Sequence, residues 1–350
     1  MRPGTLKGYN IKRLLTLLVL CCGLCPPLAA ATLPANSDKL RPGDSPTPSN
    51  SFGTNDSSLV RSMTVAQLKG LAAQKLNRDL VTRLLGPLPE WVQRIEVTGN
   101  FDLAGWRGLE LLTVQPLWET TAQDGVFFTQ VSAINYRMFD RQRFAGNLGL
   151  GYRQLLLDQK LLLGGNLFYD HEFLRGHHRL GMGAEVKYGP LDLTANGYLG
   201  LNQRSLSDGS IERVPNGVDV ELGSQLPYLP WARVYGKYYA WDNKLDNRVV
   251  RGAQMSGEAS LHRYLSIEAG ARRDEGGKSE GFFMVHFKLN RDTRPGLLEG
   301  APIIDDKIFA PRDLHQQMLT KVRRENRIIL ERSNPLNARG GLTVTVSRRN

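Results

Sequence analysis

The sequence predicts an all-β fold, a 12-stranded antiparallel transmembrane β-barrel with a short N-terminal helix. First, residues 93–290 consist of segments of roughly ten residues in which apolar side chains alternate with small or charged ones. Second, turn sequences rich in Gly, Pro, Asn and Asp separate these segments. Third, after residue 31 no apolar run is long enough for a membrane-spanning helix, so strands are expected to cross the membrane.

The N-terminus, residues 1–31, is predicted to be a secretory signal peptide. Four basic residues precede an apolar run from Leu14 to Leu24, and three small residues end at Ala31, where cleavage is expected. An uncleaved signal anchor is the alternative, but a run this short spans a bilayer poorly. Cleavage removes all three cysteines and lowers the net charge from +11 to +7, so we expect no disulfide or thiol chemistry in the mature chain.

Two short segments separate the signal peptide from the predicted strands. Residues 32–62 are rich in Pro, Ser, Asn and Asp and are predicted to form a flexible periplasmic linker. Residues 63–92 are predicted to form a periplasmic helix, because apolar residues recur at threes and fours from Thr64 to Leu85 before Gly86 and Pro87 end the pattern.

Twelve strands are predicted within residues 93–290, the β-barrel domain. Their expected ranges are 93–102, 108–120, 125–138, 143–155, 160–173, 178–188, 191–202, 213–225, 232–242, 250–262, 265–273 and 280–290. The links after the fourth, sixth, eighth and tenth strands are short, whereas those after the seventh, ninth and eleventh are longer and more polar. A barrel with a periplasmic N-terminus has this arrangement of short periplasmic turns and long outer loops.

The alternation also predicts which side chains face the lumen. From residue 180 onward, Leu180, Met182 and Val186 alternate with Gly181, Glu185 and other small or charged residues. An apolar outer face suits lipid, and lipid requires the sheet to close because unpaired backbone groups are costly there. The alternative is a soluble β-sandwich. The predicted lumen-facing residues are Asn147, Arg153, Asn166, Asp170, Arg179, Glu185, Lys187, Asn196, Glu221 and Glu258.

Five ordered motifs carry a resemblance to a known family. They are "GNLGLGYRQL" (146–155), "LGGNLFYDHE" (163–172), "HHRLGMGAEV" (177–186), "LDLTANGYLGL" (191–201) and "RVPNGVDVELGSQLPYLP" (213–230). In order and spacing they resemble the translocator barrel of the inverse autotransporters, the intimin/invasin family of type V secretion, as does "RRENRIILERS" (323–333). The resemblance covers roughly Ser57 to the end of the chain and implies a barrel that exports or holds a C-terminal segment in bacterial adhesion and virulence.

In that family a surface passenger with adhesin or invasin activity follows the linker. Only 60 residues follow Asn290 here, so we expect this chain to lack the passenger and not to bind a host receptor directly. Residues 291–350 are expected to form a linker inside the lumen, where Glu185, Glu221 and Glu258 would attract Arg323, Arg324 and Arg327. Its expected contact residues are Arg323, Arg324, Asn326, Ile328 and Leu330. The alternatives are a disordered periplasmic tail and a passenger-less pore.

No catalytic, cofactor or metal site is expected. Residues 169–178 combine histidines and carboxylates, but strand alternation separates Asp170 from His171, and His177 and His178 are expected in a surface loop. A barrel phospholipase is disfavoured because no serine stands two residues after a histidine. Expected partners are outer-membrane lipids, lipopolysaccharide, periplasmic chaperones and the barrel assembly machinery, without nucleic acid; a homodimer is left open. The expected location is the bacterial outer membrane.

Overall fold

The computed structural model describes residues 89–102, 105–139, 141–277, 279–289, 294–299, 302–333 and 344–347. The predicted signal peptide, the linker 32–62 and the helical run Thr64–Leu85 lie outside the described residues.

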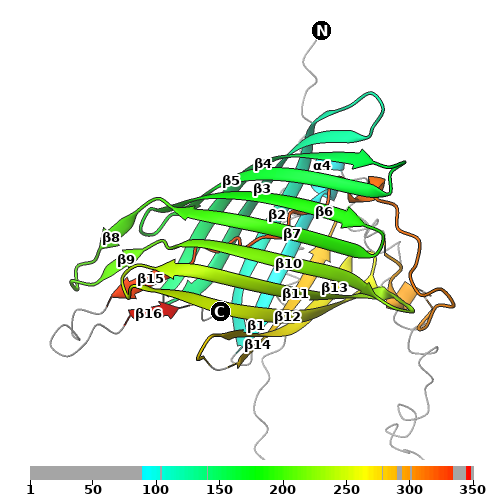
Figure 1. Cartoon of the computed structure of the whole chain (residues 1–350). Coiled ribbons are helices and arrows are strands. Elements are labelled where there is room, and N and C mark those ends of the chain that lie inside the picture. The colour runs from blue at the N-terminus through cyan, green and yellow to red at the C-terminus, as the bar shows by residue number, and fades with distance from the viewer. Residues whose placement is uncertain are drawn as a thin grey trace, which may run out of the picture. The chain divides into compact units, whose positions relative to one another are not determined.

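Twelve antiparallel strands form a closed barrel, as the alternation predicted (Figure 1). Neighbours along the chain are neighbours in the sheet, and β1 pairs with β14 to close it. The barrel strands are β1 Ile95–Asp102, β2 Gly105–Glu119, β3 Gly125–Met138, β4 Arg141–Leu156, β5 Leu161–Glu172, β6 His177–Tyr188, β7 Leu191–Gly200, β10 Asn216–Leu226, β11 Leu229–Asn243, β12 Arg248–His262, β13 Leu265–Asp274 and β14 Ser279–Lys288.

Strand ends differ from the predicted ranges where turns are tighter than expected. The first strand begins at Ile95 because Glu90–Gln93 form the short helix α4. The link after the eighth strand is a two-residue turn, Pro227 and Tyr228, instead of the six residues expected. Tyr228 has a φ of 62°, and a left-handed turn residue lets two adjacent strands reverse within two residues.

The two faces of the barrel wall have opposite character. Large apolar side chains such as Leu150 and Met182 are on the outside, and Met182 is 64% exposed. Charged side chains such as Arg153 and Asp170 are completely buried on the inside. A soluble protein has the reverse arrangement, so an apolar solvent must surround this wall. Among the described residues, no helix has the length and hydropathy required to cross a bilayer.

A second, four-stranded sheet lies at the end of the barrel that carries the longer loops (Figure 1). The loop between β7 and β10 supplies β8 (Gln203–Ser205) and β9 (Ile211–Arg213), and the C-terminal region supplies β15 (Leu330–Ser333) and β16 (Val344–Ser347). The order is β16-β15-β9-β8, so a sequence-distant segment pairs with this loop. The predicted strand ranges missed this loop sheet. Two 3₁₀ turns, η1 (Leu297–Glu299) and η2 (His315–Gln317), precede β15.

Candidate functional site

The candidate site is the contact surface between the inward-facing side chains of the barrel and residues 318–333, here called the inner segment. The C-terminal region contacts the barrel near the short turns, where Arg312 pairs with Asp192 at 2.6 Å beside the β6–β7 turn. It also contacts the loop sheet, where Glu331 pairs with Arg213 at 2.8 Å. Between these points the inner segment has bends and no regular structure until β15, and its side chains are buried or half-buried.

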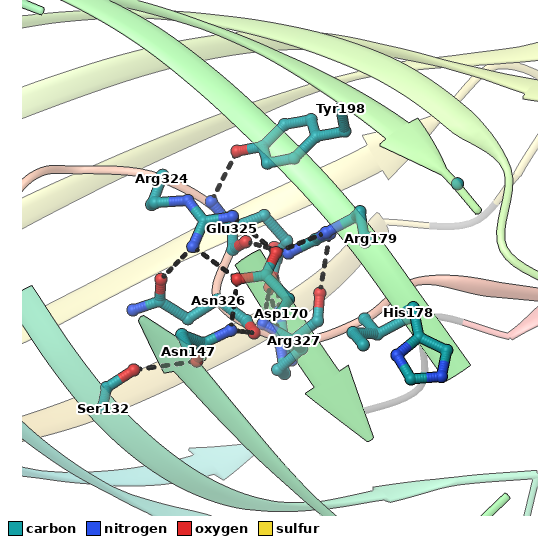
Figure 2. Close-up of polar contacts among 12 residues, drawn as sticks. Ser132, Asn147, Asp170, His178, Arg179, Tyr198, Arg324, Glu325, Asn326 and Arg327 are labelled. Atoms are coloured by element: carbon teal, nitrogen blue, oxygen red, sulfur yellow. Dashed lines mark hydrogen bonds and ion pairs between the residues drawn. The ribbon is translucent and has the colours of Figure 1, made fainter. Parts of the chain in front are cut away.

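Asp170 on β5 is the centre of the strongest ion-pair cluster (Figure 2). Arg324 of the inner segment donates to both carboxylate oxygens, at 2.9 and 2.7 Å. Arg179 on β6 donates to Asp170 Oδ2 at 2.8 Å, and Asn147 on β4 donates to Oδ1 at 2.6 Å. Charge-assisted hydrogen bonds of this kind are roughly twice as strong as neutral ones, so Asp170 fixes Arg324 against the wall.

The barrel also binds the backbone of the inner segment at this level. Arg179 donates to the carbonyl oxygens of Glu325 and Arg327 at 2.6 and 3.0 Å, and Asn147 donates to that of Asn326 at 3.0 Å. These bonds satisfy carbonyl groups that an extended strand would otherwise leave unpaired inside the wall.

A second cluster holds Arg323. Its guanidinium donates to Glu221 on β10 and to Glu268 on β13, the latter at 3.3 Å, and stacks 3.7 Å above the ring of Tyr235. Asn196 on β7 donates to the carbonyl oxygen of Arg323 at 3.0 Å. Arg323 and Arg324 therefore bind carboxylates from different sides of the barrel.

Closer to the short turns, Arg153 on β4 binds Glu185 at 2.6 Å and donates to the carbonyl oxygens of Met318 and Thr320 at 2.8 and 2.6 Å. Lys187 on β6 donates to the Thr320 hydroxyl at 3.1 Å. This end of the inner segment is thus held mainly through its backbone.

Three consecutive apolar residues of the inner segment pack into two hydrophobic clusters near the loop sheet. Ile329 packs with Tyr198, Tyr239 and Trp241. Ile328 and Leu330 point into another cluster and are completely buried. The members of that cluster are Ile134, Tyr136, Met138, Ala145 and Val214. Successive side chains of an extended chain point in opposite directions. Ile329 therefore enters one cluster, and Ile328 and Leu330 enter the other.

Glycines on the inner face make room for these contacts. A Cβ atom on Gly181 would lie 2.9 Å from Arg324 Nη2. Cβ atoms on Gly149 and Gly151 would collide with the rings of Phe168 and Phe128, over which Arg324 and Arg153 stack at 4.1 and 4.5 Å.

The loop sheet is held to the barrel rim by buried charges. Glu212 on β9 accepts from Arg143 at 2.8 Å and lies 3.1 Å from His177 Nε2. Burial alone would raise the pKa of Glu212, but the His177 contact and the Arg143 charge outweigh it and hold the pKa at about 2. Burial raises the pKa of Glu331, although the backbone N–H of Leu245 and the Arg213 charge oppose the shift.

All ten predicted lumen-facing residues are buried in the structure, and seven of them contact the inner segment directly. These seven are Asn147, Arg153, Asp170, Arg179, Lys187, Asn196 and Glu221. Glu185 acts through Arg153, and Glu258 accepts from Arg294 at 2.6 Å. Neither side-chain polar atom of Asn166 has a hydrogen-bond partner among the described residues.

The expected pairing of three glutamates with the linker arginines was largely wrong. Of the expected Arg323, Arg324 and Arg327, only Arg323 meets one of these glutamates, Glu221. Arg324 binds Asp170 instead, and Arg327 binds Glu325 of its own segment at 2.9 Å. Glu185 is neutralised by Arg153 of the barrel, and Glu258 by Arg294, which belongs to the expected linker but lies outside the inner segment.

Sequence reasoning missed several contact residues. Gln130 on β3 accepts from the backbone N–H of Val322 at 2.8 Å, and Tyr198 on β7 accepts from that of Glu325 at 2.8 Å. Glu110 on β2 accepts from Asn326. Strands β2 and β3 alternate poorly in sequence, so the inward positions of Glu110 and Gln130 gave only a weak signal.

The histidines of residues 169–178 are divided between the two faces. His177 and His178 both belong to β6, not to a surface loop. The predicted sixth strand already began at 178, and β6 begins one residue earlier because His177 pairs with Glu172 of β5. His177 is completely buried beside Glu212, whereas His178 lies 3.0 Å from His171. Within the described parts of the chain, no three His, Cys, Asp or Glu residues are grouped to hold a metal ion.

The family model "Inverse autotransporter, beta-domain" matches residues 45–326, which is more than half of the chain. The chain belongs to the inverse autotransporter β-domain family. Its structure is accordingly that of an outer-membrane β-barrel, and the expected outer-membrane location is confirmed.

Relatives include adhesins and invasins much longer than the matched region. The inverse autotransporter adhesin YeeJ of Escherichia coli (strain K12) is 27% identical over 82% of this chain and 13% of its own length. Invasin of Yersinia enterocolitica is 36% identical over 45% of this chain and 19% of its own length. Intimin of Escherichia coli O127:H6 is 28% identical over 63% of this chain and 24% of its own length.

A chain solved in work on the in-meso crystallization of membrane proteins superposes with a TM-score of 0.54 at 21% identity. The match covers 68% of this chain and 99% of the solved one. At this identity the likeness concerns the fold alone.

Proposed function

We propose that this barrel is a translocator and anchor that holds its C-terminal segment in the lumen, so that sequence after β15 is presented at the cell surface. The observation that carries the proposal is the order of contacts. Arg312 lies beside a short turn, Arg324 meets the barrel wall at Asp170, and Glu331 reaches the loop sheet. In a barrel with periplasmic short turns, that order leads outward.

The character of the contacts supports a held segment. The ligands of Arg323 and Arg324 come from strands on different sides of the closed sheet, so the inner segment is surrounded. Association with bacterial adhesion is the finer part of the proposal, and it rests on the adhesin, invasin and intimin names of the relatives. No catalytic role is proposed, and no direct host receptor is assigned.

The environment proposed for this function is the asymmetric outer membrane. The apolar outer wall would contact lipids, and its outward rim lipopolysaccharide, after periplasmic chaperones and the barrel assembly machinery have delivered and inserted the chain. A homodimer is not required, because the sheet closes within one chain.

Antibody accessibility tests the proposed direction. An epitope tag after Asn350 is expected to bind antibody on intact cells. A tag inserted after Asp208 in the β8–β9 loop serves as an outer control, and a tag after Gln123 in the β2–β3 turn serves as a periplasmic control. Labelling of the C-terminal tag only after permeabilisation would refute the proposal.

Ion conductance separates this proposal from a plain pore. In planar bilayers the full-length barrel is expected to conduct far less than a variant lacking residues 291–350, because the inner segment occupies the lumen. Equal conductance of the two proteins would favour the passenger-less pore.

A further inference from the structure

We propose that the loop between β7 and β10 is a strand-capture site that stops the outgoing chain in one register. The inference rests on the proposed translocator function and adds a device that the function alone does not require. The captured element is β15, Leu330–Ser333, and the capturing element is β9, Ile211–Arg213.

The capture uses backbone pairing. Glu331 pairs with Arg213 and Arg332 pairs with Glu212 in an antiparallel ladder, and the Ile211 backbone N–H donates to the Ser333 hydroxyl at 3.0 Å. Without β15, the β8–β9 hairpin would be two strands of three residues with an open edge. An isolated hairpin of this size is marginal, and an open edge accepts an incoming strand.

Side chains make the capture selective for this part of the chain. Arg213 binds Glu331 at 2.8 Å, and the Leu245 backbone N–H from the β11–β12 loop donates to the other Glu331 oxygen at 3.2 Å. Arg332 donates to Asp208 at 2.5 Å and to Ser210 at 3.1 Å. The β7–β10 loop therefore binds both Glu331 and Arg332, and the β11–β12 loop adds a second contact to Glu331.

A shift outward by one residue would break contacts at both ends of the inner segment. Val322 would take the place of Arg323, so Glu221 would keep only Lys237 and Glu268 would lose its arginine. Leu330 would take the place of Glu331 opposite Arg213. Removal of one partner from a buried ion pair is strongly destabilising because the other charge stays buried and uncompensated.

A shift inward by one residue is equally unfavourable. Glu325 would face Asp170 in place of Arg324, so two carboxylates would meet. The Glu331 carboxylate would enter the hydrophobic cluster that now holds Leu330, which is lined by Ile134, Tyr136 and other apolar residues. Arg323, Arg324 and the captured strand β15 therefore permit only one register of the inner segment. We propose that these two constraints together stop the outward movement of the chain at that register.

Hydrogen exchange of the full-length protein in liposomes tests the capture. Arg213→Glu and Glu331→Arg are each expected to speed exchange of the amides of residues 330–333 by about tenfold or more, while residues 322–327 stay protected. Together the two changes restore an opposite-charge pair, and part of the protection is expected to return. Arg248→Glu is the matched control, because Arg248, at the start of β12, is a mostly exposed arginine paired with Asp246.

A second pair of variants tests the register. One alanine inserted between Arg327 and Ile328 separates the arginine anchors from the captured strand and is expected to abolish protection of residues 330–333. The same insertion directly after Ser333 is expected to leave that protection intact.

The outcomes distinguish this inference from the function on which it rests. Unchanged exchange in Arg213→Glu and in the first insertion variant would overturn strand capture, while a surface-exposed C-terminal tag would leave the translocator function standing. Fast exchange of residues 318–333 in the unmodified protein would overturn both.

Discussion

Replacement of Asp170 by asparagine is the sharpest test of how the inner segment is held. The substitution preserves side-chain volume and removes the charge that Arg179 and Arg324 share. Both guanidinium groups are buried, and Asp170 itself is completely buried. The variant therefore leaves two neighbouring cations with no common anion.

The magnitude follows from the number and kind of bonds. Asp170 accepts four hydrogen bonds, three of them from guanidinium groups. Bonds to charged groups contribute about 1.5–3 kcal/mol each, but they are not additive within one cluster. Removal of one partner from a buried pair costs about 3–5 kcal/mol, and we expect Asp170→Asn to lower the free energy of unfolding by that amount.

A double-mutant cycle with Arg324→Met isolates the contact between wall and segment. The single change Arg324→Met should cost less than Asp170→Asn, because Asp170 keeps Arg179 and Asn147 while the methionine still packs on Phe168. The coupling energy is expected to be about 1–3 kcal/mol.

Urea unfolding of the protein in liposomes, followed by tryptophan fluorescence, provides the measurement. Asp246→Asn serves as the control, since its partner Arg248 is mostly exposed and such a pair contributes at most about 1 kcal/mol. A loss below about 0.5 kcal/mol for Asp170→Asn would refute the reasoning, because a buried guanidinium group that loses its carboxylate partner is expected to cost about 3–5 kcal/mol.

Three further predictions concern the outer wall, two strand glycines and the loop sheet. Leu150→Arg on the outer face should cost about 2–4 kcal/mol in liposome unfolding, and a cost equal to that of Leu150→Gln would argue against lipid contact. Gly200→Ala should prevent folding into a heat-resistant barrel because its Cβ would lie 2.0 Å from a backbone oxygen, whereas Gly236→Ala, with open space, should fold normally. Since the folded pKa of Glu212 is about 2 and its unfolded value is near 4.3, its stabilisation is complete above about pH 5 and is lost as the pH falls toward 2. Pepsin cleavage in the β8–β9 loop should therefore increase on acidification, and Glu212→Gln should remove much of that dependence.

The sequence was sufficient for the barrel because the relevant signal is local. A two-residue period is visible within any strand, so the faces of β4, β6 and β7 could be assigned without knowledge of their neighbours. Turn lengths then gave the short-turn and long-loop ends. Strand ends were less accurate where a single left-handed residue such as Tyr228 closed a turn that looked longer.

The site was only half predictable, because its pairing is not local. Alternation showed that Asp170 and Glu221 point inward, but not which arginine each would meet, since Arg324 is 154 residues away from Asp170. The loop sheet was beyond local reasoning as well. The three residues of β9 pair with β8 of the same loop on one edge and with β15 on the other, and β15 lies more than a hundred residues later in the chain.

The polarity of the lumen explains why one register can be preferred at all. Hydrophobic burial is non-directional and roughly proportional to area, so an apolar lumen would hold an apolar chain almost equally well in many positions. A wall of buried carboxylates and arginines penalises every register that leaves one of them unpaired. The inner segment combines the two effects. Arg323 and Arg324 pair with particular carboxylates, and the three apolar residues that begin at Ile328 pack into two hydrophobic clusters. Stability alone would favour more apolar contact, so the retention of buried charge on both sides is better explained by a requirement for position than by a requirement for strength.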